Sequence, residues 1–398
     1  MQSFLYLFFL LFAVFFFTST ASGQYFGRNK VRYERFDFQV METEHFDVYF
    51  YPDMEKAAPI AARMAERWYA RLSKILNHEL RGRQPLILYS NSTHFQQTST
   101  ISGILGEGVG GVTEVLKRRV VLPLGPTLAA TDHVIGHELV HAFQYDMTAF
   151  ADTGYARATS SINTLPLWMI EGLAEYLSIG PADPHTAMWM RDSLQDKKGL
   201  PSIKQLVNPR FFPYRFGQSV WAYITGRFGD DSVPAIMKSV NRSRDMSASI
   251  QKILGVSVEE LSLGWHEALK NAYTPLQEQT DLIDPASRVL FKGDRQNRLN
   301  IAPSLSPDGS HIVFLSSRDL FSIDMYLADV RTGKISRKLV NTATNPHFES
   351  LQFIKSAGAW DSEGTRFAFG AVSKGRPVLS IYDVRKGAQA KERVFEEL

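Results

Sequence analysis

The sequence predicts an α+β protein built from several parts, because the pattern of apolar residues changes twice along the chain. Over residues 24–128, apolar β-branched runs flank one long helical stretch, which indicates a mixed sheet. Over residues 129–278 the apolar spacing is helical. Over residues 279–398 short strands and glycine turns recur at a fixed period. We therefore expect an α/β part, a helical part and a set of partial all-β repeats, in that order.

Residues 1–23 have the order of a secretory signal peptide. The run from Phe4 to Phe17 is wholly apolar and too short to span a bilayer comfortably, and small residues follow it up to Ala21 and Gly23. No Lys or Arg precedes the run, so an uncleaved anchor is the alternative. We expect an exported chain, periplasmic or secreted, with no stable membrane span after cleavage.

The composition excludes several classes of function. The chain has 398 residues, of which 44 are basic and 41 acidic, and a net charge of +3 gives no general attraction to nucleic acid. It has no cysteine, which rules out disulfides, thiolate metal sites and cysteine nucleophiles. Any metal ion must be held by His, Asp or Glu.

The α/β part contains three predicted strands and one predicted helix. The strands are His45 to Tyr51, Pro85 to Ser90 and Arg118 to Leu124, and the helix runs from Met54 to Leu76. A glycine-rich stretch, GILGEGVGG, precedes the third strand. It lacks a G-K-[ST] ending and opens no helix, so it is not a phosphate-binding loop.

The segment HVIGHELVHAFQYD, residues 133–146, contains an H-E-x-x-H motif. On a helix, His137 and His141 are four residues apart and face the same way, so both imidazoles can reach one ion. Glu138, next to the first histidine, is placed to take a proton from a bound water. The alternative is a structural helix that happens to carry histidines.

Three residues before the motif are predicted to have structural roles. Thr131 and Asp132 suit the N-cap of the helix. His133 lies one turn before His137, but three ligands in a row along one helix cannot form a tetrahedron. We therefore interpret His133 as a first-turn polar residue.

A second helix, Trp168 to Ser178, offers two further acids. Glu171 and Glu175 share one face of this mostly apolar helix, where paired acids call for a reason other than solvation. A third ligand placed as in the metzincins is excluded, because Gln144 and Met147 stand where that class has Gly and His. The alternative for the two acids is a solvated helix face.

Together, HELVHAFQYD, WMIEGLAEY and the preceding sheet resemble the peptidase MA-like gluzincins over roughly residues 40–275. The resemblance implies a zinc metalloendopeptidase with Zn²⁺ held by His137, His141 and Glu171. It implies that Glu138 is the general base and that Glu175 holds the ring N–H of a ligating histidine. The implied substrate is a peptide or protein.

The resemblance also implies a donor for the oxyanion. The stretch FFPYRFGQSVWAYITGRFG resembles the tyrosine-containing helix start of the family, which makes Tyr214 the first candidate. Arg215 is a neighbour that could play a similar part. Tyr223 lies inside the helix and is interpreted as a core residue.

Two further expectations concern the surroundings of the site. The loop-like AFADTGYARATSSINTLP makes the connection to Glu171 longer than in the aminopeptidases of the group, and we interpret it as an insertion beside the cleft. The strand before the metal helix is expected to bind extended substrate through the backbone of Val120, Val121 and Leu122, if it is an edge strand. An interior strand with no substrate role is the alternative.

The C-terminal part resembles TolB-type β-propeller repeats. Ser306-Pro307-Asp308-Gly309 and Asp361-Ser362-Glu363-Gly364 each precede a strand, and their glycines are about 55 residues apart. Gly333 and Gly387 repeat at nearly the same interval. A propeller closes with roughly four to eight blades, so either the chain is a fragment or this part is not a closed propeller.

Two other functions remain open from the sequence. One is a non-catalytic periplasmic or secreted binding protein that acts through its β repeats on a protein partner. The other is a zinc hydrolase of non-peptide amides, such as cell-wall material.

Overall fold

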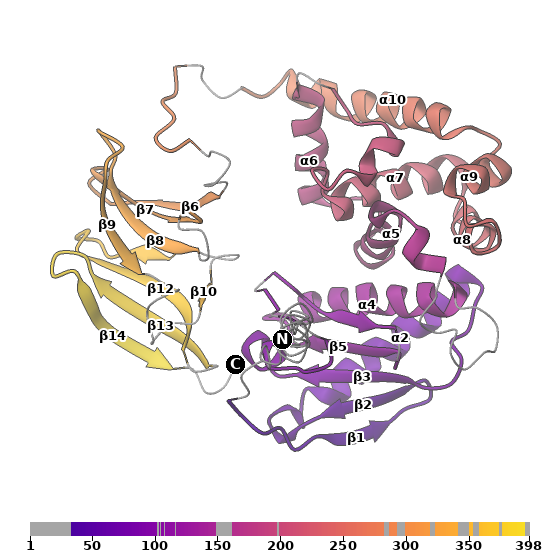
Figure 1. Cartoon of the computed structure of the whole chain (residues 1–398), viewed down its shortest axis with the longest axis horizontal. Coiled ribbons are helices and arrows are strands. Elements are labelled where there is room, and N and C mark those ends of the chain that lie inside the picture. Colours follow the sequence, from indigo (N-terminus) through magenta and orange to yellow (C-terminus); the bar gives the residue numbers. More distant parts are fainter. Residues whose placement is uncertain are drawn as a thin grey trace, which may run out of the picture.

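The computed structural model describes residues 33–394, except 102, 104, 107, 116, 149–160, 197–198, 282–285, 293–298, 319–322, 341–349, 353–357 and 374–375. The expected signal peptide, and residues 149–160 of the expected insertion, lie outside the described residues. Among the described helices, none is both long and apolar enough to cross a membrane. Its described residues are of mixed α+β class and form helices and three separate sheets (Figure 1).

The N-terminal sheet has five strands in the order β1-β2-β3-β5-β4. Their bounds are Gln39–Glu42 (β1), Phe46–Phe50 (β2), Gln84–Tyr89 (β3), Arg119–Pro123 (β5) and Val112–Glu114 (β4). Strands β2, β3 and β5 are parallel, whereas β1 and β4 run antiparallel at the two edges. β2, β3 and β5 fall in the three predicted strands, and β1 and β4 are additional.

Two helices accompany this sheet. The long helix α2, Ala58–Leu76, connects the parallel strands β2 and β3 and buries a face that includes Ala61, Ala65 and Leu72. It begins after a short 3₁₀ turn, η1 (Pro52–Met54), and so starts later than the predicted Met54. The short helix α3, Ser92–Gln96, follows β3.

The helical part runs from α4 to α10 and continues the core of the sheet. Its α-helices are α4 (Leu128–Thr148), α5 (Leu167–Ile179), α6 (Pro184–Gln195), α7 (Pro213–Phe228), α8 (Ser232–Ser243), α9 (Met246–Leu254) and α10 (Val258–Gln277). Two 3₁₀ turns, η3 (Ser161–Thr164) and η4 (Ile203–Val207), lie between them. One hydrophobic cluster includes residues of both the sheet and these helices, so the two parts share a core.

Helix α4 begins one turn earlier than the sequence predicts. Thr131 and Asp132 lie inside it, so the prediction that they cap the helix is wrong. The hydroxyl of Thr127 instead accepts a hydrogen bond from the Ala130 amide at 3.1 Å. Asp132 forms an ion pair with Arg67 of α2 at 2.5 Å.

Helices α5 and α7 cross at two glycines. A Cβ on Gly172 would collide with the backbone of Gly217, and a Cβ on Gly217 would collide with the carbonyl oxygen of Trp168. The indole Nε1 of Trp221 also donates to the Met169 carbonyl at 3.1 Å. Because neither crossing residue has a side chain, the start of α7 lies close against the face of α5 that carries the acids.

The C-terminal part consists of two antiparallel sheets that pack side by side and are not closed into a propeller (Figure 1). The first contains β6 (Asn300–Leu305), β7 (His311–Ser316), β8 (Asp324–Asp329) and β9 (Ile335–Val340). The second contains β10 (Ser350–Gln352), β11 (Ala359–Trp360), β12 (Arg366–Ser373), β13 (Arg376–Asp383) and β14 (Ala388–Val394). Residues of both sheets form one hydrophobic cluster.

The sequence repeat corresponds to equivalent turns in the two sheets. Asp308 and Asp361 each accept backbone N–H bonds at the turn before a strand. Asp329 and Asp383 do the same at the next turn along the chain. The four predicted turn glycines all have φ between 64° and 73°, the left-handed region that disfavours other residues.

Candidate metal centre

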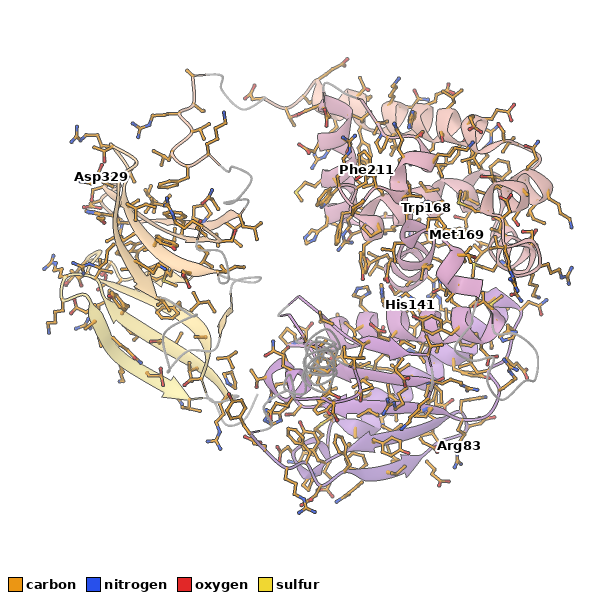
Figure 2. All side chains as sticks on the ribbon, viewed as in Figure 1. Arg83, His141, Trp168, Met169, Phe211 and Asp329 are labelled. Carbon is orange, nitrogen blue, oxygen red and sulfur yellow. The ribbon has the colours of Figure 1, made fainter. Side chains whose placement is uncertain are left out.

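Three side chains from α4 and α5 bring one donor atom each to a common point. His137 Nε2 and His141 Nε2 lie 3.3 and 3.2 Å from Glu171 Oε2, and they lie 3.2 Å from each other. Both histidines are buried, and Glu171 is partly buried. Figure 2 shows His141 on α4 below Trp168 and Met169 of α5. Sequence reasoning named these three residues, and the structure brings them together as a group that could hold a metal ion.

The packing of α4 fixes the direction in which its histidines face. Gly136, beside the first histidine, lies so close to the ring of Trp68 that a Cβ would be 2.6 Å from it. This contact holds α4 tightly against α2. The opposite side of α4 is therefore left to face α5, and the i, i+4 spacing places both rings on that side.

Glu138 extends toward strand β4, beside the cluster. Its Oε2 lies 2.6 Å from the hydroxyl of Thr113, which also lies 2.9 Å from the main-chain oxygen of Glu138. A Cβ on Gly111 would be 2.8 Å from the Glu138 Cγ. The sequence did not predict either neighbour, although Gly111 ends the glycine-rich stretch GILGEGVGG and Thr113 lies two residues after it.

Glu175 and Arg215 form a second layer beside His137. Glu175 Oε1 lies 3.3 Å from His137 Nδ1, while its Oε2 accepts from Arg215 Nη1 at 3.0 Å. Arg215 also donates to Asp183 at 3.2 Å, so its guanidinium is engaged by two carboxylates. The structure thus places Arg215 as a partner of Glu175 rather than as a donor to the oxyanion.

His133 also approaches Glu175, at 3.7 Å, so His133, His137 and Glu175 form a second group with metal-ligand spacing. The Arg215 charge on the same carboxylate opposes a cation there. His133 does not join the first group, as the sequence predicts. It lies in the second turn of α4 rather than the first, because the helix starts at Leu128.

The charges in the cluster are strongly coupled. Burial lowers the pKa of His137, but hydrogen bonds to Glu171 and Glu175 outweigh it and raise the pKa to about 10. Burial raises the pKa of Glu171, but hydrogen bonds from His137 and His141 bring it well below its usual range. The two carboxylates therefore stay charged and stabilise positive charge at this point, either as a proton on the His137 ring or as a metal ion that displaces that proton.

Two tyrosines flank the histidines. The ring of Tyr214 is stacked on that of His137 at 5.7 Å with an interplanar angle of 11°, and Tyr145 is stacked on His141 at 6.3 Å. Burial and the nearby Glu171 carboxylate raise the pKa of Tyr214, and the same causes raise the pKa of Tyr145 to about 12. Both phenols remain protonated donors at neutral pH. Sequence reasoning missed Tyr145, which lies one helical turn after His141.

Gln144 is a further residue of the centre that sequence reasoning missed. Its Oε1 lies 2.9 Å from His141 Nδ1, and its Nε2 donates to the Ile170 carbonyl at 3.0 Å. In the sequence, Gln144 is informative only as a residue that excludes the metzincin pattern. Its position three residues after His141 was the available signal, since i and i+3 are neighbours on a helix.

The expected substrate strand is placed differently from the prediction. Val120 and Val121 pair with β3 on one side and with β4 on the other, and Leu122 is paired with β3 and fully buried. β5 is thus an interior strand at Val120 and Val121, which is the alternative that the sequence left open, so the condition for substrate contacts there is not met. The edge of the sheet nearest Glu138 is β4.

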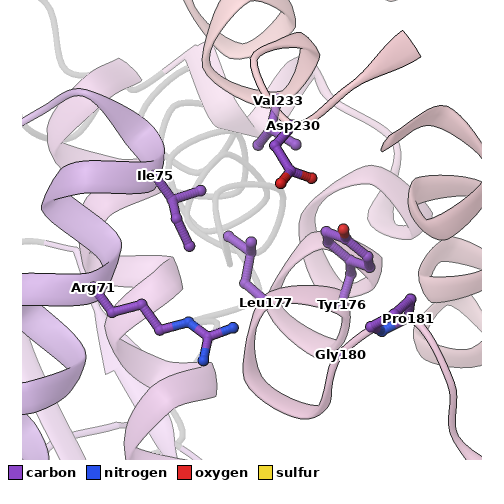
Figure 3. A pocket seen from close by; sticks show the side chains of 8 residues that line it. All are labelled: Arg71, Ile75, Tyr176, Leu177, Gly180, Pro181, Asp230 and Val233. Carbon is purple, nitrogen blue, oxygen red and sulfur yellow. The ribbon is translucent and has the colours of Figure 1, made fainter. Parts of the chain in front are cut away.

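A separate small cavity lies on another side of α5. It has a volume of about 100 Å³, and Arg71, Leu177 and Asp230 are among its lining residues (Figure 3). None of its lining residues belongs to the metal cluster. Leu177 and Tyr176 line it, whereas Glu171 and Glu175 use the opposite side of the same helix.

No family model matches the chain, and a search of curated proteins finds no match.

Proposed function

We propose that the protein is a zinc metalloendopeptidase whose centre is formed by His137, His141 and Glu171. The observation that carries the proposal is the triangle of donor atoms, whose edges measure 3.2 to 3.3 Å. Ligands at zinc–nitrogen distances of 2.0–2.1 Å in a tetrahedron are about 3.3 Å apart. The side chains therefore already have the spacing that a tetrahedral ion requires.

The donor set favours zinc over other common ions. Two imidazoles and one carboxylate are typical of catalytic zinc sites, which use three protein ligands and keep a fourth position for water or substrate. Calcium and magnesium prefer oxygen ligands only. When bound, zinc would supply Lewis acidity, polarising a carbonyl group and lowering the pKa of a water.

The protein groups around the centre have complementary roles. Glu138 accepts the proton of the attacking water and passes it to the leaving amine. The hydroxyl of Thr113 holds the Glu138 carboxylate in place at 2.6 Å. Tyr214 donates to the developing oxyanion, and its raised pKa keeps the phenol protonated for that purpose.

The substrate that fits this arrangement is an extended peptide along β4. Within the described residues, β4 is the last strand of this sheet and lies next to β5. A peptide that adds a strand at this edge would pass beside Glu138. We replace the expected contacts at Val120, Val121 and Leu122 with this edge.

The test is cleavage of an unfolded protein such as casein by the purified, zinc-loaded chain. The wild type is expected to cleave casein, and Glu138→Gln is expected to retain zinc and lose at least about 100-fold in rate. Glu267→Gln, the same change at an exposed position of α10, is expected to cleave like the wild type.

Retention of zinc without cleavage by the wild type would contradict the proposal. It would favour the binding protein that acts through its β repeats, or a hydrolase of other amides, which a screen of cell-wall substrates would detect. A protein partner for the β repeats stays a prediction under either outcome.

A further inference from the structure

Gln144 is a buried neutral amide that links the two halves of the metal centre. It is only 1% exposed, so its polar amide must find hydrogen-bond partners inside the protein. Its two polar ends contact His141 on its own helix and the Ile170 carbonyl on α5. Ile170 is the residue immediately before Glu171. The Gln144 side chain therefore contacts one candidate ligand, His141, and the backbone next to another, Glu171.

The two contacts determine how the amide is oriented. A carbonyl oxygen only accepts hydrogen bonds, so the end of Gln144 that faces Ile170 must be the donor NH₂ group. The other end is then the amide oxygen, which also only accepts. It follows that His141 must carry its proton on Nδ1.

A proton on Nδ1 leaves the other ring nitrogen of the neutral imidazole with a lone pair. That nitrogen, His141 Nε2, is the atom that lies 3.2 Å from both Glu171 Oε2 and His137 Nε2. The tautomer set by the Gln144 amide is therefore the one in which His141 can act as a ligand at this point.

We propose that Gln144 is a positioning residue that fixes the tautomer and the ring orientation of His141. Through its bond to the Ile170 carbonyl, it also fixes the position of His141 relative to Glu171. This inference rests on the proposed zinc site for its purpose, but the tautomer follows from the hydrogen bonds alone. The two histidines are then oriented in different ways. His137 faces the charged Glu175, whereas His141 faces a neutral amide that needs no counter-charge in a buried position.

Two variants at this position separate the two contacts. Gln144→Glu keeps an acceptor for His141 Nδ1 but loses the donor to Ile170. Gln144→Met keeps the approximate volume and loses both contacts. Gln218→Met is the matched control, because Gln218 is also buried and also links two segments, through its bonds to Thr186 and the Gly180 carbonyl.

The first readout is the ¹⁵N chemical shifts of the His141 ring in chelator-treated full-length protein, at a pH where the ring is neutral. We expect the Nδ1–H form alone in the wild type, in Gln144→Glu and in Gln218→Met, and a mixture of tautomers in Gln144→Met. The second readout is zinc affinity by chelator competition. We expect Gln144→Met to bind zinc about 10- to 100-fold more weakly than the wild type, and Gln218→Met to bind it normally.

The proposal is overturned if Gln144→Met keeps the Nδ1–H tautomer, or binds zinc as tightly as the wild type. If Gln144→Met does not fold, Gln144→Glu decides by the same shifts, since loss of the Nδ1–H form there would also overturn it. A wild type that binds no zinc would overturn the proposed function, and the ring shifts would still decide the role of Gln144.

Discussion

The three candidate side chains of α4 are each tied to another element, directly or through one intervening residue. Glu138 contacts Thr113 of β4, and His137 contacts Glu175 of α5. His141 contacts Gln144, which is in turn bound to the backbone of α5. The centre is thus oriented before any ligand binds, which lowers the cost of reaching the reactive geometry.

Removing the Thr113 hydroxyl is expected to slow cleavage without loss of zinc. In Thr113→Val the shape is kept, but the Glu138 carboxylate loses a charge-assisted hydrogen bond of about 1.5–3 kcal/mol. Steady-state kinetics should show a kcat lower by about tenfold. Thr113→Ser keeps the hydroxyl and should stay near the wild-type rate. A wild-type kcat in Thr113→Val would show that the Thr113 hydroxyl does not position Glu138 for cleavage.

The three candidate ligands could be named from the sequence, whereas the residues that contact them could not. The i, i+4 spacing on a helix places His137 and His141 together by geometry alone. Thr113 lies in the short strand β4, and Gly111 directly precedes it. Their contacts with Glu138 join residues about 25 positions apart in the sequence, which no local pattern reveals. The role of Gln144 could not be predicted, because the sequence does not show which face of α4 meets the Ile170 carbonyl.

At the scale of elements, α4 is anchored near its C-terminal end by Asp146. This buried carboxylate binds His78 Nε2 at 2.8 Å and Arg81 Nε at 3.2 Å, both in the segment after α2. Burial raises the pKa of Asp146, but the hydrogen bond from His78 and the charges of Arg81 and Arg118 lower it below its ordinary value overall.

This anchor predicts how stability depends on pH. A carboxyl whose pKa is lower in the folded state stabilises the fold above the unfolded pKa of about 3.9, and this contribution is lost as the pH falls through the folded pKa. At pH 7, Asp146→Asn should therefore have a free energy of unfolding about 1–3 kcal/mol lower than the wild type, measured by urea denaturation. The gap to the wild type should narrow toward pH 3. An equal gap at both pH values would contradict the assignment.

The crossing of α5 and α7 is a second feature at this scale. Gly217→Ala places a methyl group against the Trp168 carbonyl, and backbone cannot move aside as a side chain can. We expect a loss of about 1–3 kcal/mol in the free energy of unfolding, and a lower kcat because Tyr214 lies at the start of α7. Thermal unfolding and kinetics of the same sample measure both.

Gly226→Ala is the control for this crossing, since it lies on the same helix with nothing within 4 Å of an added Cβ. It should be neutral or slightly stabilising, because alanine favours helix over glycine by about 1 kcal/mol. If Gly217→Ala behaves like Gly226→Ala, the close approach of α5 and α7 is not required.

The elements were predictable where a long periodic pattern marked them. The helices that carry the site, and the strands β2, β3 and β5, follow from apolar spacing. The order of the sheet does not follow from this spacing, because the short strand β4 pairs with the outer edge of β5 and makes β5 an interior strand. This is why the interior position of Val120 and Val121 could be seen only in the structure.

On the scale of the whole molecule, the metal centre and the C-terminal sheets have separate cores. The cluster that contains α4 and α5 ends within α10, and the cluster of the two sheets begins at β7. Phe367, fully buried in β12, is central to the second cluster and packs edge-on against Trp360 at 5.4 Å. The sequence repeat predicted strands of partial propeller blades and left their closure open, whereas the packing of two separate sheets on one core is seen only in the structure.

Separate cores predict separate responses to mutation. Phe367→Ala should destabilise the C-terminal sheets by about 3–5 kcal/mol, while zinc content stays at the wild-type level. Hydrogen exchange followed by mass spectrometry resolves the two regions, and Leu379→Ala, at a partly exposed position of the same sheet, should change little. Loss of protection in α4 and α5 to the same extent would show that the molecule unfolds as one unit.

The central claim is that α4 and α5 together form one zinc site. The most direct measurement is X-ray absorption at the zinc edge, with metal content, on the purified chain and on Glu171→Ala. We expect about one zinc per chain, bound by two imidazoles and oxygen at about 2.0–2.2 Å, and a clear loss of zinc in Glu171→Ala. A wild type that retains no zinc, or a variant that binds it as well as the wild type, would contradict the account.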